Sequence, residues 1–297
     1  MLGYRASNGQ IKPGRDRNAP VQQMAEVPCG NCRDCRIRRA RDWAIRCQHE
    51  AQTSKKSCFA TLTYNDDEIP DDLSVRKEHW QLFAKRLRKK AGKFRYLATG
   101  EYGDDTARPH YHALIFGMDF LDDRYKWRTE RRGAHSYDVF RSPTIESVWP
   151  YGNIELADAT FASISYVARY TVKKLNGQDE MDYLERVSFI GEVWHVAPEF
   201  IVSSRRPGLG RDWIKKYWRD VYPCDFVLVE GKKFKPPAYY DNYMKEQHPE
   251  VWDAVYRKRI EGANDPAFAD EREWARLCTK REWRELRHKA MSTKGKI

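Results

Sequence analysis

Two histidines lie two residues apart in the segment Arg108–Gly117, at the start of a run of strand-forming residues. Side chains at positions i and i+2 of a strand point to the same face, so the imidazoles of His110 and His112 can reach one point in space. Tyr111 points to the opposite face. Two converging imidazoles indicate a metal site, and two ordinary polar residues at the start of a core strand are the plain alternative.

A carboxylate lies nine residues upstream of the first histidine, where Glu101 ends a second apolar run over residues 94–101. The segment 103–109 between the two runs contains Gly, Asp and Pro and is typical of a turn. A hairpin would therefore bring Glu101 beside His110 and His112. Two His and one Glu with open coordination positions suit a divalent ion such as Mg²⁺, Mn²⁺ or Zn²⁺ acting as a Lewis acid.

A pair of tyrosines, Tyr166 and Tyr170, is four residues apart in a predicted helix over residues 158–175. Residues at i and i+4 share a helix face, so both hydroxyls are expected on one side, with Lys173 and Lys174 within one further turn. The same spacing is also that of two half-buried packing residues. The pattern alone leaves both interpretations open.

Seven cysteines, five of them within the first 58 residues, favour a reducing compartment over a disulfide framework. Cys29, Cys32 and Cys35 form two overlapping C-x-x-C units, the spacing that brings two thiolates to one ion. Cys47 or His49 could supply a fourth ligand. A structural Zn²⁺ site and a reduced cysteine-rich turn at the start of a helix are the two alternatives.

The net charge of +11 is uneven, because residues 1–58 carry 12 Lys/Arg and 5 Asp/Glu. Such asymmetry predicts a polyanionic partner, with nucleic acid favoured over membrane because no amphipathic membrane segment stands out. Aromatic residues make up 13% of the chain and could stack on bases or pack the core. The predicted DNA-binding residues are Arg36, Arg38, Arg39, Arg41, Lys174, Arg205 and Arg206.

No apolar run is long enough to span a membrane, and the N-terminal segment has no signal-peptide character, so we expect an intracellular protein. No Gly-x-x-x-x-Gly-Lys motif is present, so nothing implies hydrolysis of a nucleoside triphosphate. The expected elements are an extended arm over 1–27, a basic helix over 36–52, a central strand over 58–64, a helix over 74–91 that begins at Ser74, the hairpin over 94–117, a loop-rich insertion over 119–145, a strand over 152–156, a helix over 158–175 capped by Asp158, and helices within 241–290.

Taken in order, the Thr-containing strand, the His-Tyr-His motif and the Tyr-x-x-x-Tyr-x-x-Lys motif resemble the HUH endonucleases of rolling-circle replication. The resemblance is greatest to the replication initiators of small circular single-stranded DNA phages, the microviruses, particularly the gokushovirus group. Tyr111 is a mild departure, because the residue between the two histidines is usually aliphatic in the family. The matching segments are 28–36, 59–64, 100–103, 108–117, 166–170 and 205–208, which together extend over roughly residues 28–240.

The resemblance implies an α+β fold whose central antiparallel sheet is ferredoxin- or RRM-like and flanked by helices. It divides the chain into a basic arm with the Cys cluster (1–54), a nuclease domain (55–220) and a helical basic extension (221–297). It also implies a reaction: Mg²⁺ or Mn²⁺ polarises the scissile phosphate, and a tyrosine attacks it to leave a 5′-phosphotyrosine and a free 3′-OH. The implied roles are metal binding by His110, His112 and Glu101, nucleophilic attack by Tyr166 or Tyr170, and charge neutralisation by Lys173.

The implied partners are the single-stranded origin of a circular genome and the host replication helicase and polymerase, in the cytoplasm of a host bacterium. One alternative is a non-catalytic protein that binds single-stranded nucleic acid, and metal-dependent nicking would separate it from an initiator. Another is a different HUH enzyme, a relaxase or transposase, which strand-transfer products on a transposon end would favour.

Overall fold

The computed structural model of the 297-residue chain describes residues 2–5, 11–13, 24–26, 28, 30, 32–132, 135–173, 183–187 and 190–294. The chain divides into two compact units, one formed by Ile37–Tyr243 and the other by Met1–Arg36 with Met244–Ile297. The division into three parts at residues 54 and 220 stays a prediction. None of the helices in the described part of the chain has the length and apolarity that a membrane-spanning segment needs.

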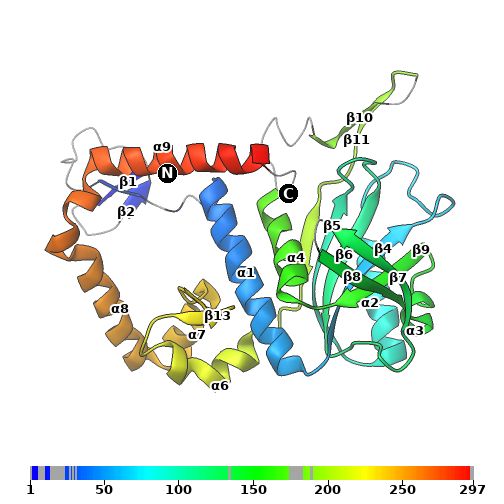
Figure 1. Cartoon of the computed structure of the whole chain (residues 1–297), viewed down its shortest axis with the longest axis horizontal. Helices are drawn as coiled ribbons and strands as arrows, with labels where there is room; N and C mark the ends of the chain where they lie inside the picture. The colour runs from blue at the N-terminus through cyan, green and yellow to red at the C-terminus, as the bar shows by residue number, and fades with distance from the viewer. Residues whose placement is uncertain are drawn as a thin grey trace. The chain divides into compact units, whose positions relative to one another are not determined.

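A seven-stranded sheet, counted over the described residues, forms the centre of the larger unit (Figure 1). Its strand order is β12-β5-β6-β4-β9-β8-β7, and every neighbouring pair is antiparallel. The α+β class and the central antiparallel sheet are therefore confirmed. The strands are β4 (Ser57–Tyr64), β5 (Arg95–Tyr102), β6 (Pro109–Phe116), β7 (Tyr125–Arg132), β8 (His135–Arg141), β9 (Gly152–Asp158) and β12 (Phe200–Ser203).

Helix α2 (Lys77–Ala91) covers one face of the sheet and buries Trp80, Phe83 and Leu87 there. The spacing of these residues gives the helix a single apolar stripe, as the sequence predicts. Ser74 does not cap this helix, because Arg76 occupies the N-cap position. The Ser74 hydroxyl instead accepts a hydrogen bond from the backbone of Ala197 at 2.9 Å.

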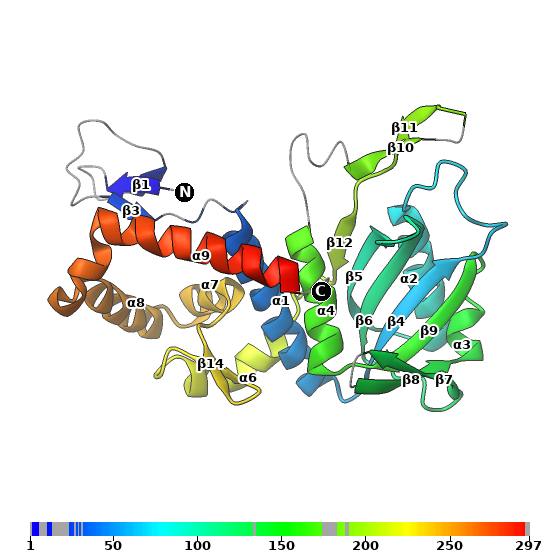
Figure 2. The ribbon, with the colours of Figure 1, turned by 45° about the horizontal axis from the view of Figure 1, so that its top comes forward.

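Helices α1 (Arg33–Ser54) and α4 (Phe161–Lys173) cover the opposite face of the sheet (Figure 2). Ile164, Val167 and Ala168 of α4 form a buried cluster with Leu97 and Leu114 of the sheet. Asp158 belongs to β9 and is not the cap of α4. The Thr160 hydroxyl accepts a hydrogen bond from the backbone N–H of Ser163 at 3.2 Å at the start of that helix.

The segment 119–145 is not a loop-rich insertion, because it contains the antiparallel pair β7 and β8 and the short helix α3 (Pro143–Glu146). The alternation of apolar residues that marks a strand is weak here, since both faces of the pair carry charges. Lys126 pairs with Asp138 on one face, and Arg128 pairs with Glu130 on the other. Backbone pairing and ion pairs hold this part of the sheet where an apolar face does not.

The N-terminal residues also differ from the predicted extended arm, since β1 (Leu2–Arg5), β2 (Ile11–Pro13) and β3 (Met24–Glu26) form a small sheet. The expected C-terminal helices are present as α8 (Pro249–Asn264) and α9 (Trp274–Lys294). The remaining elements are β10 (Glu185–Val187), β11 (Val193–His195), α6 (Arg211–Val221), β13 (Val227–Val229), β14 (Lys232–Phe234), α7 (Ala238–Gln247), and the single turns Pro266–Phe268 and Asp270–Arg272.

Candidate metal and tyrosine site

The register of the β5–β6 hairpin brings the predicted metal ligands together. Glu101 on β5 is the direct partner of His110 on β6, and Thr99 is the partner of His112. One ligand atom from each of Glu101, His110 and His112 lies within 4.8 Å of the others. Within the described parts of the chain, these residues are the group of three or more candidate ligands that could hold one metal ion.

Neighbouring groups orient each of the three candidate ligands. Thr99 donates a hydrogen bond to Glu101 Oε1 at 2.8 Å, and Thr61 Oγ1 lies 3.0 Å from His112 Nδ1. His110 Nδ1 lies 3.2 Å from a backbone carbonyl oxygen, that of Arg108. In the tautomer in which Nδ1 carries the proton, both imidazoles donate these bonds and have Nε2 as the nitrogen with a free electron pair.

This is the arrangement that holds metal-binding histidines in their productive tautomer and orientation. Glu101 and His112 are 1% and 8% exposed, so a carboxylate and an imidazole lie close together with little access to water. Burying polar groups of this kind without compensation is unfavourable, and a cation supplies that compensation. The donor set and its supporting contacts fit a divalent ion.

Tyr166 projects from α4 to the metal cluster. Its phenolic oxygen lies 3.4 Å from His112 Nε2, and the two rings meet edge to face with centroids 5.2 Å apart. Phe59 of β4 packs against both rings, with its centroid 5.3 Å from that of His112 and 6.3 Å from that of Tyr166. The half-buried phenol therefore has a fixed position beside a candidate ligand, which combines the packing and functional interpretations left open by the sequence.

The other predicted catalytic residues are less fully described. Tyr170 and Lys173 lie in α4, but their side chains are outside the described residues, as is the whole of Lys174. Tyr170 follows Tyr166 by one helical turn in the same helix, so their common helix face follows from the backbone. The roles of these three residues stay predictions.

The cysteines separate into two groups. Cys29 is outside the described residues, while Cys32 is exposed and Cys35 is buried at the start of α1. Cys47 is twelve residues beyond Cys35 in the same helix, a separation of about 18 Å. The structure therefore does not bring Cys47 to the other cysteines, and a zinc site at Cys29, Cys32 and Cys35 stays a prediction.

Cys47 and His49 are instead part of the packing between α1 and its neighbours. Cys47 is fully buried in the cluster that contains Leu114, and this burial raises the pKa of its thiol. His49 Nδ1 lies 2.9 Å from the hydroxyl of Tyr240, and its ring stacks on Trp213 with centroids 3.5 Å apart. Neither residue is a fourth zinc ligand in this structure.

The predicted DNA-binding arginines lie at two places. Arg36, Arg38, Arg39 and Arg41 are on α1, and Arg205 with Arg206 is exposed directly after β12. Within the α1 group, Arg41 Nε lies 3.9 Å from Asp42 Oδ1, which is a long ion pair. DNA contact by these residues stays a prediction.

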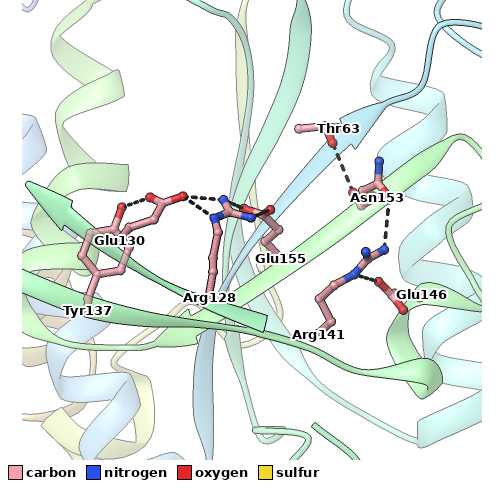
Figure 3. Close-up of polar contacts among 8 residues, drawn as sticks. All are labelled: Thr63, Arg128, Glu130, Tyr137, Arg141, Glu146, Asn153 and Glu155. Carbon is pink, nitrogen blue, oxygen red and sulfur yellow. Dashed lines mark hydrogen bonds and ion pairs between the residues drawn. The ribbon is translucent and has the colours of Figure 1, made fainter. Parts of the chain in front are cut away.

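Two further arginines lie on the metal-site face of the sheet and were not singled out from the sequence. Arg128 on β7 contacts Glu130 and Glu155, and the Tyr137 hydroxyl donates to Glu130 at 2.5 Å (Figure 3). The hydrogen bonds from Tyr137 and Arg128 hold the pKa of the Glu130 carboxyl below its usual value. The i, i+2 spacing of Arg128 and Glu130 was the available signal, but it is informative only once the segment is known to be a strand.

Arg141 on β8 forms the second part of this network, with an ion pair to Glu146 and a hydrogen bond to Asn153 Oδ1 at 3.1 Å (Figure 3). The pairing of β9 with β4 places Glu155 opposite Thr61 and Asn153 opposite Thr63. Since β4 also pairs with β6, the charged network and the metal cluster occupy one continuous face of the sheet.

Tyr111, the departure from the aliphatic pattern, points to the other face as predicted. It is fully buried, and its hydroxyl lies 2.5 Å from that of Tyr64 and donates to the carbonyl oxygen of Arg76 at 2.7 Å. Burial raises the pKa of Tyr111 to about 12. The aromatic side chain therefore ties β6 to β4 and the start of α2 without disturbing the histidines on either side.

The comparison with known proteins agrees with this geometry. Residues 57–175, which include both candidate ligand strands and α4, match the family model of the replication-associated protein ORF2. The chain is 34% identical to "Replication-associated protein VP4" of Bdellovibrio phage phiMH2K over 84% of its own length and 77% of that protein's. The chain belongs to the replication-associated proteins of small single-stranded DNA phages.

Two further relatives extend this assignment. "Replication-associated protein ORF2" of Spiroplasma virus 4 is 31% identical over 88% of this chain and 81% of its own length. "Replication-associated protein ORF4" of Chlamydia phage 1 is 27% identical over 74% of this chain and 54% of its own length. No solved structure gives a significant match. The predicted resemblance to phage replication proteins is confirmed, and a role in DNA replication follows from it.

Proposed function

We propose that this phage replication protein nicks and rejoins the single-stranded origin of a circular genome, using Tyr166 or Tyr170 as the nucleophile. The observation that carries the proposal is the position of the Tyr166 phenol, 3.4 Å from a nitrogen of His112, within a cluster of two imidazoles and a carboxylate. A tyrosine held against candidate metal ligands is what phosphotyrosine chemistry requires. A protein that only bound DNA would have no need of this arrangement.

The proposed reaction exchanges one phosphoester for another. The phenolic oxygen forms a bond to the scissile phosphorus and loses its proton, while the bond from phosphorus to the 3′ oxygen breaks and that oxygen takes up a proton. The products are a 5′-phosphotyrosine and a free 3′-OH that can prime synthesis. The second tyrosine attacks after one round of synthesis and releases a unit-length circle.

A divalent ion at Glu101, His110 and His112, Mg²⁺ or Mn²⁺, would supply Lewis-acid stabilisation of charge on the phosphate. The residues of the chain do the rest: α4 holds the phenol at a fixed distance from the cluster, and Lys173 is proposed to neutralise charge as it develops. The bond energy is conserved in the tyrosine ester. This is consistent with the absence of a nucleotide-binding Gly-x-x-x-x-Gly-Lys motif from the sequence.

The proposed setting is the cytoplasm of a host bacterium, where the free 3′-OH and the displaced strand would be used by the host replication polymerase and helicase. The surplus of basic residues, +11 over the chain, favours association with nucleic acid. The DNA contacts proposed from the sequence, at α1 and at Arg205 and Arg206, would position the origin and would not take part in the chemistry.

The test uses single-stranded oligonucleotides that tile the phage genome, incubated with the protein and Mn²⁺. Nicking through a 5′-phosphotyrosine leaves the 3′-labelled fragment attached to the protein and releases the 5′-labelled fragment with a free 3′-OH. We expect adduct formation to require Mn²⁺ and to be lost in the double variant Tyr166→Phe/Tyr170→Phe. Full adduct formation by that variant would overturn the assignment of the nucleophiles, and DNA binding without any nicking by the natural protein would favour the non-catalytic alternative.

A further inference from the structure

A groove of about 1030 Å³ lies at the end of the sheet away from the metal cluster. It lies along α2 and the edge strand β12, and residues at the start of β5 contribute to its lining, among them Arg95. Arg95 precedes Glu101 by six residues on β5, which corresponds to about 20 Å along the strand. The groove is therefore separate from the candidate metal site.

Positive charge dominates this groove. Its two acidic residues are Glu50 and Asp212, and Glu50 is already engaged. One Glu50 oxygen lies 2.5 Å from Arg95 Nε, and the other accepts a hydrogen bond from the backbone N–H of Gly210 at 2.7 Å. The other cations that line the groove form no ion pair with any described residue, and they are Lys77, Arg88, Lys93, Arg205 and Arg206.

The cations are spaced along the groove and are not gathered at one point. Lys77 and Arg88 are eleven residues apart on α2, which corresponds to about 16 Å of helix. Arg88 is held in place by the rings of Phe94 and Tyr96, whose centroids are 4.8 and 5.6 Å from its guanidinium carbon. Arg205 and Arg206 follow β12 on the opposite wall.

This spacing suits a linear polyanion better than a single small anion. Phosphates recur every ~3.4 Å along one strand of duplex DNA, so a groove of this length faces about four or five of them. A pocket for one phosphate would instead gather its cations around a single point. Alignment of unpaired cations along a groove is the electrostatic pattern expected of a backbone-binding surface.

We propose that this groove is a second nucleic-acid site, which binds the phosphodiester backbone of DNA about 20 Å from the candidate metal cluster. The phosphodiester backbone is common to single-stranded and duplex DNA, and either could occupy the groove. The proposal rests on the proposed function only in taking DNA as the polyanion. It assigns the groove to holding DNA and gives it no part in the cleavage chemistry.

The test compares two triple variants that remove the same charge. Lys77→Gln/Lys93→Gln/Arg205→Gln takes three cations from the groove, and Lys85→Gln/Lys89→Gln/Lys232→Gln takes three exposed cations from outside it. Fluorescence anisotropy measures the binding of a labelled single strand and of the matching duplex over a range of NaCl concentrations. EDTA is present throughout, so a protein that never nicks DNA would give the same binding result.

We expect the groove variant to bind at least one of the two DNAs roughly tenfold more weakly or worse. The slope of log K against log [NaCl] should fall by about 2 to 3, since three phosphate contacts are lost. The DNA that loses more affinity identifies the natural occupant. Equal affinities and salt slopes for the groove variant and the control variant would overturn the proposal, and so would displacement of labelled DNA by inorganic phosphate at an ionic strength where NaCl has no effect.

Discussion

The phenolic oxygen of Tyr166 lies 3.4 Å from Nε2 of His112, the imidazole nitrogen that is left with a free electron pair when Nδ1 donates to Thr61. The candidate nucleophile and a candidate metal ligand are thus in direct contact, although they are 54 residues apart in the sequence. Their contact depends on β4, which pairs with the histidine strand on one side and with the strand leading to α4 on the other.

The first prediction separates the two roles. Tyr166→Phe should keep Mn²⁺ binding within about twofold, because the ligand atoms of Glu101, His110 and His112 remain. Adduct formation through this tyrosine should fall by roughly 100-fold or more, because a phenyl ring has no nucleophilic oxygen. Isothermal titration measures the first quantity and gel analysis of the adduct the second. Tyr256→Phe, a change at an exposed tyrosine, is the control and should affect neither.

The second prediction concerns the hydroxyl that orients His112. Thr61→Val keeps the shape of the side chain but removes the oxygen 3.0 Å from Nδ1, so Mn²⁺ affinity should fall by about 10- to 100-fold. Thr63→Val is the matched control, since it lies on the same face of β4 and its hydroxyl makes only a 3.5 Å contact with a carbonyl oxygen. Equal Mn²⁺ affinities for the two variants, measured by titration calorimetry, would contradict the orienting role of Thr61.

The third prediction concerns the charged network of Figure 3. Arg128→Met removes the cation shared by Glu130 and Glu155 and leaves two neighbouring carboxylates without it. Because these side chains are partly exposed, the loss of stability should be modest, about 1 kcal/mol, or a fall in Tm of roughly 2–4 °C. Lys126→Met breaks a single ion pair on the other face of β7 and should cost less, which differential scanning calorimetry can determine.

The fourth prediction concerns the pH dependence of folding. Burial lowers the pKa of His49 to about 3, whereas an unfolded chain protonates histidine below about pH 6.5. The unfolded state therefore binds more protons between these two values, and His49 makes the protein less stable as pH falls through that window. The contribution at pH 4.5 is about 2–3 kcal/mol relative to neutral pH.

Urea titrations between pH 7.5 and 4.5 measure this effect. His49→Gln cannot take up the proton but retains a side chain able to hydrogen-bond to Tyr240, so its stability should depend less steeply on pH than that of the natural protein. His195→Gln, at an exposed position, is the control and should leave the pH dependence unchanged. Parallel pH profiles for His49→Gln and the natural protein would contradict the prediction.

The metal cluster could be predicted because it depends on short-range geometry. Glu101, His110 and His112 lie on two strands joined by a tight turn, and the two-residue period of a strand fixes which side chains meet. The contact of Tyr166 with this cluster depends on the order of strands in the sheet, which no local pattern contains. It followed from the family resemblance and not from the spacing of the residues.

The errors have equally specific causes. The β7–β8 pair was missed because its strands carry charges on both faces, as Lys126 and Arg128 illustrate, and so lack the apolar alternation by which strands are recognised. Cys47 was grouped with Cys35 on residue type alone. A helix over 36–52 was itself predicted, and the rise of that helix already separates these two residues by about 18 Å.

The central position of β4 has a consequence for heat inactivation. The candidate ligands lie on one side of this strand and the element that carries the tyrosine follows on the other, so their separation can change only if hydrogen bonds in the middle of the sheet break. Such bonds open mainly in global unfolding, whereas edge strands and loops open locally at lower cost. Nicking activity should therefore persist up to the temperature of the main unfolding transition and disappear together with it.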